Sequence, residues 1–141
     1  MNSTNKLPLE GVVVIDLGQV YQGPYAGFLM AQAGATVIKV EPPNGEPVRH
    51  RARISKGNSV PFAMLNANKR NISLNLKSPD GAKVLKELAA KADVLIENYA
   101  PGVLDRLGAE VLGGVALHRA KLPQHTEEFA ARLVERADEL V

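Results

Sequence analysis

Apolar residues in the first hundred positions of the chain fall into short runs that alternate with stretches of helical spacing. Four runs predict strands, at residues 12–17, 36–41, 72–76 and 93–97. Short runs rich in valine, isoleucine and leucine are typical of strands that are buried on both faces of a parallel sheet. About ten residues of helical character separate the first two runs, which predicts a βαβ unit with a right-handed crossover.

Proline, glycine and serine mark the expected ends of the helices. Gly23-Pro24 predicts the start of the first helix, with proline in the first helical position, and Gly34 predicts its end. Ser78 is expected to cap a second helix that has Pro79 in its first position. In that helix Val84, Leu85 and Leu88 are expected to share one face.

The remaining segments complete an α/β fold, a partial parallel sheet flanked by helices. Residues 61–68 and 101–107 predict short helices, and 42–60 predict a long polar loop. The character of the chain changes after Gly108, where periodicity weakens. Residues 126–141 then predict a C-terminal amphipathic helix with Thr126 as its cap.

Composition narrows the class of partner. The chain has 141 residues and 45% hydrophobic content, which suits one domain with a modest core. A net charge of +2 and only 4% aromatic residues argue against a nucleic-acid partner. The chain has no cysteine, a polar start and no apolar run near the roughly 20 residues of a membrane span, so we expect a cytoplasmic protein without a membrane partner.

Two groups of cations are candidates for holding phosphate. Residues 49–56 contain a basic cluster, and Lys69-Arg70 precede the third predicted strand. Each group fits either a phosphate-bearing ligand or a solvated surface segment. His118 and His125 have no carboxylate at ligand spacing, so no metal site is expected.

Polar residues also follow predicted strands at the sheet edge where open α/β proteins bind ligands. Residues 18–24 form a glycine-containing turn after the first strand, but their spacing is neither a dinucleotide fingerprint nor a phosphate-binding loop. Asn98 offers a donor and an acceptor at the end of the fourth strand, or serves as a turn residue. Asp16 and Glu41 fit an acid or base role, or local pairing, which is the commoner use of strand-end carboxylates.

Four ordered blocks together resemble the amino-terminal region of class III CoA-transferases. They read LEGVVVID at 9–16, GATVIKVEPP at 34–43, NANKRNISLNLK at 66–77, and ADVLIENY with PGVLDRLG at 92–108, and Gly23-Pro24 lies between the first two blocks. The resemblance implies a Rossmann-like sheet and a CoA-binding region at 7–108, followed by a divergent or truncated segment at 109–141. The same superfamily holds formyl-CoA transferases, crotonobetaine-type transferases and α-methylacyl-CoA racemases.

The resemblance also implies where an acyl-CoA substrate lies; no permanently bound cofactor is implied. The sheet edge at Pro42 and the Lys69-Arg70 pair would surround the nucleotide end of CoA. Residues that match other CoA-contacting positions are Leu74, Asn98 and Arg106. Residues 21–23 match the loop that approaches the thioester; they are Tyr21, Gln22 and Gly23, and some members have glutamine where Tyr21 stands.

In the family, a downstream aspartate attacks the acyl-CoA to give a mixed anhydride, and CoA then passes to an acceptor carboxylic acid. The resemblance ends just past Gly108, and Asp138 has no matching context. We therefore expect no catalytic residue here and a chain limited to binding CoA. There are two alternatives to a CoA-transferase fragment. The chain corresponds to part of an acyl-CoA racemase, or it is a non-catalytic module that binds CoA or another partner. Since the family forms interlocked homodimers, self-association is also expected.

Overall fold

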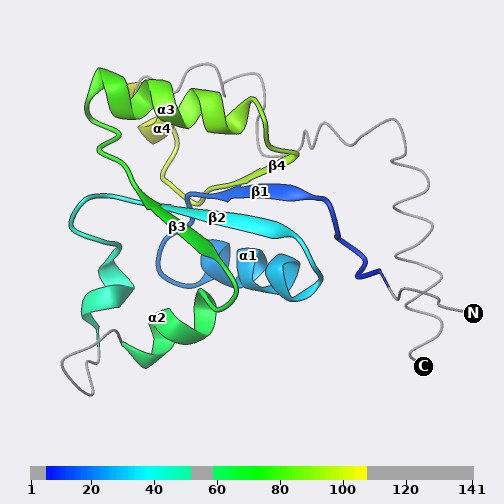
Figure 1. The fold of residues 1–141 in the computed structure, drawn as a ribbon. Coiled ribbons are helices and arrows are strands. Elements are labelled where there is room, and N and C mark those ends of the chain that lie inside the picture. The colour runs from blue at the N-terminus through cyan, green and yellow to red at the C-terminus, as the bar shows by residue number, and fades with distance from the viewer. Residues whose placement is uncertain (1–5, 52–58, 108–141) are drawn as a thin grey trace, which may run out of the picture.

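A computed structural model describes residues 6–51 and 59–107, which form a parallel sheet with helices on both faces (Figure 1). The elements in chain order are β1 (Val13–Asp16), α1 (Gln22–Gln32), β2 (Thr36–Glu41), the 3₁₀ helix η1 (Pro47–His50), α2 (Val60–Leu65), β3 (Arg70–Ser73), α3 (Pro79–Ala89), β4 (Val94–Ile96) and α4 (Val103–Arg106). The predicted α/β class with a parallel sheet is confirmed. The segment 109–141 and its expected helix lie outside the described residues.

The strand order places a topological switch between β1 and β4. The order is β3-β2-β1-β4, and every neighbouring pair is parallel. The chain therefore adds β2 and β3 on one side of β1 and then returns to add β4 on the other side. Helices α1 and α2 lie below the sheet in Figure 1, whereas α3 and α4 lie above it. In open α/β sheets, ligands bind beyond the carboxyl ends of the strands at such a switch.

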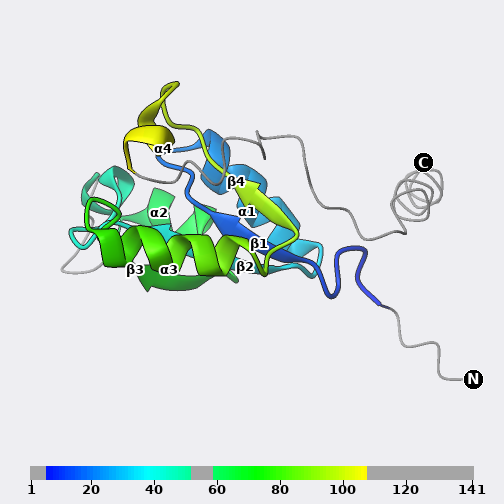
Figure 2. The ribbon, with the colours of Figure 1, turned by 90° about the horizontal axis from the view of Figure 1, so that it is seen from above.

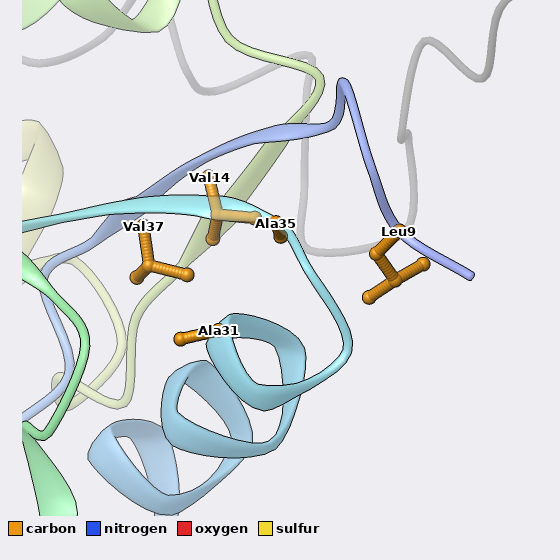
Figure 3. Packing of buried hydrophobic residues seen from close by; sticks show 5 residues of the cluster. All are labelled: Leu9, Val14, Ala31, Ala35 and Val37. Carbon is orange, nitrogen blue, oxygen red and sulfur yellow. The ribbon is translucent and has the colours of Figure 1, made fainter. Parts of the chain in front are cut away.

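Alternating strand residues supply two apolar cores. On the α1 side, Val14 and Val37 pack with Leu9, Ala31 and Ala35 (Figure 3). Since successive side chains of a strand point to opposite faces, the neighbouring positions belong to the other core.

The second core lies beneath α3, which lies in front of the sheet in the view from above (Figure 2). Its buried members are Ile15, Leu17, Val40 and Leu85. Both cores share β1 and β2, and this two-sided burial explains why β1 reads as a continuous apolar run up to Asp16 and why β2 has apolar residues on both of its faces.

Helix α1 lies close to the sheet because small residues face it. Gly23, Gly27 and Ala31 recur at every fourth position and are buried, while Leu29 is 49% exposed. The helix begins at Gln22, so Pro24 is its third residue and the prediction of proline in the first position is wrong. Proline remains compatible with the first turn because the amide groups there have no partner within the helix.

Other features also differ from the sequence prediction. Strand β3 lies at Arg70–Ser73 instead of 72–76, because its pairing with β2 runs from Ile38 to Glu41. The predicted polar loop at 42–60 contains η1, whose Val48 is completely buried. In α3, Leu85 is buried but Val84 is 36% exposed, because the face that meets the sheet is formed by Gly81, Ala82 and Leu85.

Candidate CoA-binding site

One asparagine joins the carboxyl ends of the two strands at the topological switch. Asn98 Nδ2 donates a hydrogen bond to the carbonyl oxygen of Gln19 (2.9 Å), and Asn98 Oδ1 accepts one from the Gln19 amide (2.7 Å). The turn at 18–21 also packs tightly against α1, since a Cβ on Gly23 would lie 2.6 Å from the Gly18 Cα atom. The donor and acceptor of Asn98 thus fix the turn that follows β1.

A cavity of about 450 Å³ opens beside this turn. Its walls combine the turn, the ends of β2 and β3, and the α4 region. The lining residues include Gln19, Glu41, Pro42, Pro43, Asn44, Leu74, Asn75, Leu76, Lys77, Tyr99, Val103 and Leu107. The structure therefore brings Pro42 and Leu74 together, and Asn98 adjoins them through its bonds to Gln19. Burial raises the pKa of Tyr99, so its hydroxyl stays neutral beside the cavity.

A second cavity of about 570 Å³ adjoins the first and is rich in cations. The two share Leu76, Lys77 and Leu107 in their walls. Its charged lining residues are Lys77, Lys83, Lys86 and Arg106. Of these four residues, Arg106 was predicted from the sequence and the three lysines were not. The sequence contains a pattern that could have predicted them. Lys83 and Lys86 are three residues apart on one predicted helix, and Lys77 directly follows the third apolar run.

The residues matched to the thioester loop divide between surface and interior. Tyr21 is 50% exposed and precedes α1, and Gln22 is exposed in its first turn. Gly23 is buried against Gly18. Of these three residues, Tyr21 and Gln22 therefore present their side chains outward.

Lys69 points into the molecule. Its ammonium donates to Asp16 Oδ2 (2.7 Å), the Pro24 carbonyl oxygen (2.7 Å) and Asn66 Oδ1 (3.0 Å). Burial lowers the pKa of Lys69, and the hydrogen bond and charge of Asp16 oppose that shift only in part. These three bonds use all three ammonium hydrogens and tie β3 to β1 and α1.

Arg70 is exposed and begins β3, whereas the cavity borders the opposite end of that strand. Leu74 lies four positions after Arg70, a distance of about 13 Å at the usual rise of an extended chain. The structure thus does not bring the Lys69-Arg70 pair to the cavity that Pro42 and Leu74 line.

The two strand-end carboxylates pair locally, as the commoner use of such residues predicted. Asp16 is completely buried; its Oδ1 accepts from the Gly18 amide (2.8 Å) and lies 3.9 Å from the Lys39 ammonium. Glu41 Oε2 accepts from Arg49 Nε (2.6 Å), and Glu41 Oε1 accepts from Arg49 Nη2 (2.7 Å). Neither carboxylate is presented as a free acid or base.

Glu41 also shows how this pairing changes ionisation. Burial pushes the pKa of Glu41 upward, but hydrogen bonds from Arg49, the Glu46 amide and Asn71, with the Arg49 charge, hold it below its ordinary value. The hydrogen bond to Glu41 raises the pKa of Arg49 in turn. The pair is therefore ionised throughout the neutral range.

The basic cluster at 49–56 is mostly committed to other contacts or lies outside the described residues. The Arg49 guanidinium lies 3.8 Å from the centre of the Phe62 ring, and the His50 ring is 2.9 Å from the Asn44 carbonyl oxygen. Arg51 is exposed, while Arg53 and Lys56 fall outside the described range. Within the described residues, no helix is long and apolar enough to cross a membrane, and no three potential metal ligands form a group.

Sequence comparison defines the family. Residues 9–112 match CoA-transferase family III, and the chain belongs to that family. It is 46% identical over 101 residues to the formyl-CoA:oxalate CoA-transferase of Streptomyces coelicolor, which covers 71% of this chain and 25% of the relative. The enzyme of that name from Bradyrhizobium sp. is 50% identical over 102 residues, covering 71% and 24%. The chain thus spans about a quarter of the length of these curated relatives.

Solved structures show the same fold. A CAIB/BAIF family protein from Brucella suis superposes with a TM-score of 0.69 at 33% identity, over 73% of this chain and 29% of that one. The protein Rv3272 from Mycobacterium tuberculosis gives a TM-score of 0.66 at 36% identity, over 72% and 28%. In both, the likeness covers almost three-quarters of this chain and under a third of the larger protein.

Proposed function

We propose that this chain binds the CoA part of an acyl-CoA at the carboxyl ends of β1–β4. The carrying observation is the pair of adjoining cavities, one lined by Pro42 and Leu74 and the other by Lys77, Lys83, Lys86 and Arg106. CoA has the matching division, an uncharged pantetheine arm joined to a phosphorylated nucleotide. Cationic side chains bind phosphates through charge-assisted hydrogen bonds.

The proposed orientation places the phosphates in the basic cavity and the thioester end toward the 18–21 turn. Asn98 supports this orientation indirectly, because its bonds to Gln19 hold one wall of the first cavity. Tyr21 and Gln22 lie beside that wall, where the acyl end would emerge. In this arrangement Lys69 does not contact CoA but holds Asp16 and α1 in place. Arg70 remains a separate candidate for a contact with the nucleotide.

Calorimetric titration of CoA into the 141-residue chain tests the proposal. We expect weak binding that weakens further at high salt, since its main contacts are charged. Arg106→Ala and Lys77→Ala should each lower affinity about threefold or more, less than the full ~1.5–3 kcal/mol of a charged hydrogen bond because both are solvent-accessible. Lys91→Ala, an exposed lysine beyond the cavities, is the matched control, and Arg70→Ala tests Arg70. Absence of heat at millimolar CoA in a folded sample would contradict the proposal.

We further propose that the full-length protein to which this chain corresponds moves CoA between an acyl-CoA and a carboxylic acid. We also propose that this chain alone does not perform that reaction. Covalent catalysis of this kind needs a positioned carboxylate nucleophile, and Asp16 is completely buried and paired with lysines. The relatives named above make formyl-CoA and oxalate the first substrates to try. A new thioester that is lost on mutating Asp16, Asp105 or Asp138 would show that the chain carries its own nucleophile.

Self-association is the remaining part of the proposal. Its support is a set of four exposed apolar side chains on α1 and α2, namely Tyr25, Leu29, Val60 and Met64. Large exposed apolar patches commonly mark interaction surfaces. Sedimentation velocity should show association that Leu29→Lys with Met64→Lys reduces. A monomer at all concentrations would contradict this part and leave CoA binding untouched.

A further inference from the structure

Val20 adopts a backbone conformation that its side chain disfavours. Its φ angle is +66°, in the left-handed region, where a β-branched residue is a genuine outlier. Such conformations cost on the order of 1–3 kcal/mol and persist only when surrounding contacts determine them. Something must therefore hold the 18–21 turn in place, beyond the bonds of Asn98 to its neighbour Gln19.

Glu46 makes the contact that meets this requirement. Its Oε2 atom accepts a hydrogen bond from the Val20 amide at 3.0 Å, across 26 residues of chain, and the residue is only 1% exposed. Its other oxygen, Oε1, accepts no hydrogen bond from the described part of the chain. Burying a carboxylate with one oxygen unpaired is unfavourable, so ordinary stability does not explain a glutamate at this position.

Buried cations nearby explain how the charge of Glu46 is tolerated. Lys39 and Lys69 have almost fully buried side chains and share the single carboxylate of Asp16. Two ammonium groups against one carboxylate leave an excess positive charge, and Glu46 supplies the second negative charge. Burial lowers the pKa of Lys69 on balance, and the charge of Glu46 is the smallest of the causes that oppose this shift.

Glu46 also belongs to the segment that forms part of the wall of the first cavity. Its amide donates to Glu41 Oε2 at 3.0 Å, and Pro42, Pro43 and Asn44, which precede it by two to four residues, line the cavity. Gln19, which immediately precedes Val20, lines the same cavity. One side chain therefore connects two segments of the cavity wall that are distant in the sequence.

We propose that Glu46 is a positioning residue that holds Val20 in its left-handed conformation and so fixes the Gln19 wall relative to the 42–44 wall. The contact itself is independent of ligand. Its consequence for ligand, a cavity shaped in advance for CoA, rests on the proposed function above.

Amide hydrogen exchange of the full chain tests the contact without any ligand. In Glu46→Ala the Val20 amide should exchange about tenfold faster or more, because a turn opens locally once its acceptor is lost. The Leu17 and Thr36 amides, bonded to Ile96 and Val12 within the sheet, should change much less. Glu46→Gln keeps an acceptor oxygen and should retain most of the Val20 protection, and Glu87→Ala, at an exposed glutamate of α3, should change nothing at Val20.

A double-mutant cycle with Val20→Gly tests whether Glu46 acts through Val20. If Glu46 only stabilised the fold in general, its effect on the melting temperature would not depend on the residue at position 20. Glycine adopts positive φ without steric cost, whereas loss of Glu46 lets a strained Val20 relax and recovers part of the lost stability, so the fall in melting temperature caused by Glu46→Ala should be larger in the Val20→Gly background. Additive effects would overturn the inference. So would unchanged Val20 exchange in Glu46→Ala, or equal loss of protection throughout the sheet in both Glu46 variants.

Calorimetry then separates this inference from the proposed function. If the contact shapes the cavity, Glu46→Ala should bind CoA more weakly than wild type, and Glu87→Ala should bind it equally well. Equal CoA affinity of Glu46→Ala and wild type would overturn the cavity role. If wild type binds no CoA, the proposed function fails, while the exchange and melting results still decide whether Glu46 holds Val20.

Discussion

The two faces of the sheet are stabilised by different means, although the same strands supply both. On the α3 face, Ile15, Leu17, Val40 and Leu85 form a continuous apolar core. On the α1 face the apolar cluster around Val14 and Val37 covers only the part nearer the amino ends of the strands. Toward the carboxyl ends that face carries buried charges instead.

The charged part of the α1 face contains alternate residues of β1 and β2, together with two side chains from neighbouring segments. Its members are Asp16, Lys39, Glu41, Glu46 and Lys69. Replacing buried ion pairs with apolar residues is often neutral or stabilising, so stability alone does not account for this choice. The charges instead fix backbone geometry at the switch, where the amide of Gly18 bonds to Asp16 and that of Val20 to Glu46.

Removing the central carboxylate should have the largest effect. Asp16→Asn leaves the nearby ammonium groups of Lys39 and Lys69 with less compensation, and breaking a buried pair in this way costs about 3–5 kcal/mol. Urea denaturation followed by circular dichroism measures the loss. Asp80→Asn is the control, because Asp80 is exposed in the first turn of α3 and its charge contributes about 0.3–1 kcal/mol there. Similar small losses in both variants would show that the charged part of the face is not critical.

On the α3 face, stability should depend on the volume of the buried side chains. Leu85 is completely buried, so Leu85→Ala should lower the free energy of unfolding by about 2–5 kcal/mol through lost burial and a cavity. The adjacent Val84 is 36% exposed, and Val84→Ala should change stability by only about 0.5 kcal/mol. The same denaturation experiment measures both. Equal effects at the two positions would contradict the assigned face of α3.

The smallest effect should be a difference in pH dependence at Glu41, whose partner Arg49 is 26% exposed. The pKa of Glu41 is held below its ordinary value of 4.5 in the folded protein. Its carboxylate therefore stabilises the fold above pH 4.5, and this contribution is lost as the pH falls through the lower, folded-state pKa. Stability measured from pH 7 downward should fall less steeply in Glu41→Gln than in wild type. Parallel pH profiles would contradict the stabilising role of the pair.

Particular residues show why part of the site was predictable from the sequence. Pro42, Leu74 and Asn98 lie beside or at the ends of apolar runs, so strand prediction alone places them at one edge of a parallel sheet. The structure brings Pro42 and Leu74 into one cavity and Asn98 against its wall. The position of Lys69 could not be predicted in this way. Its charge and its neighbour Arg70 indicated a surface position, but its long side chain binds Asp16, which lies 53 residues earlier in the chain.

The sequence by itself determined the strands, the helix order and the family, because these depend on local periodicity and on short ordered blocks. The tertiary structure alone decided which charges are buried, which face of α3 meets the sheet and that Glu46 meets Val20. Those outcomes depend on strand register and crossover geometry, which bring distant residues together. A charged residue has the same sequence pattern whether it binds a ligand or an internal carboxylate, and only its partners in space separate the two.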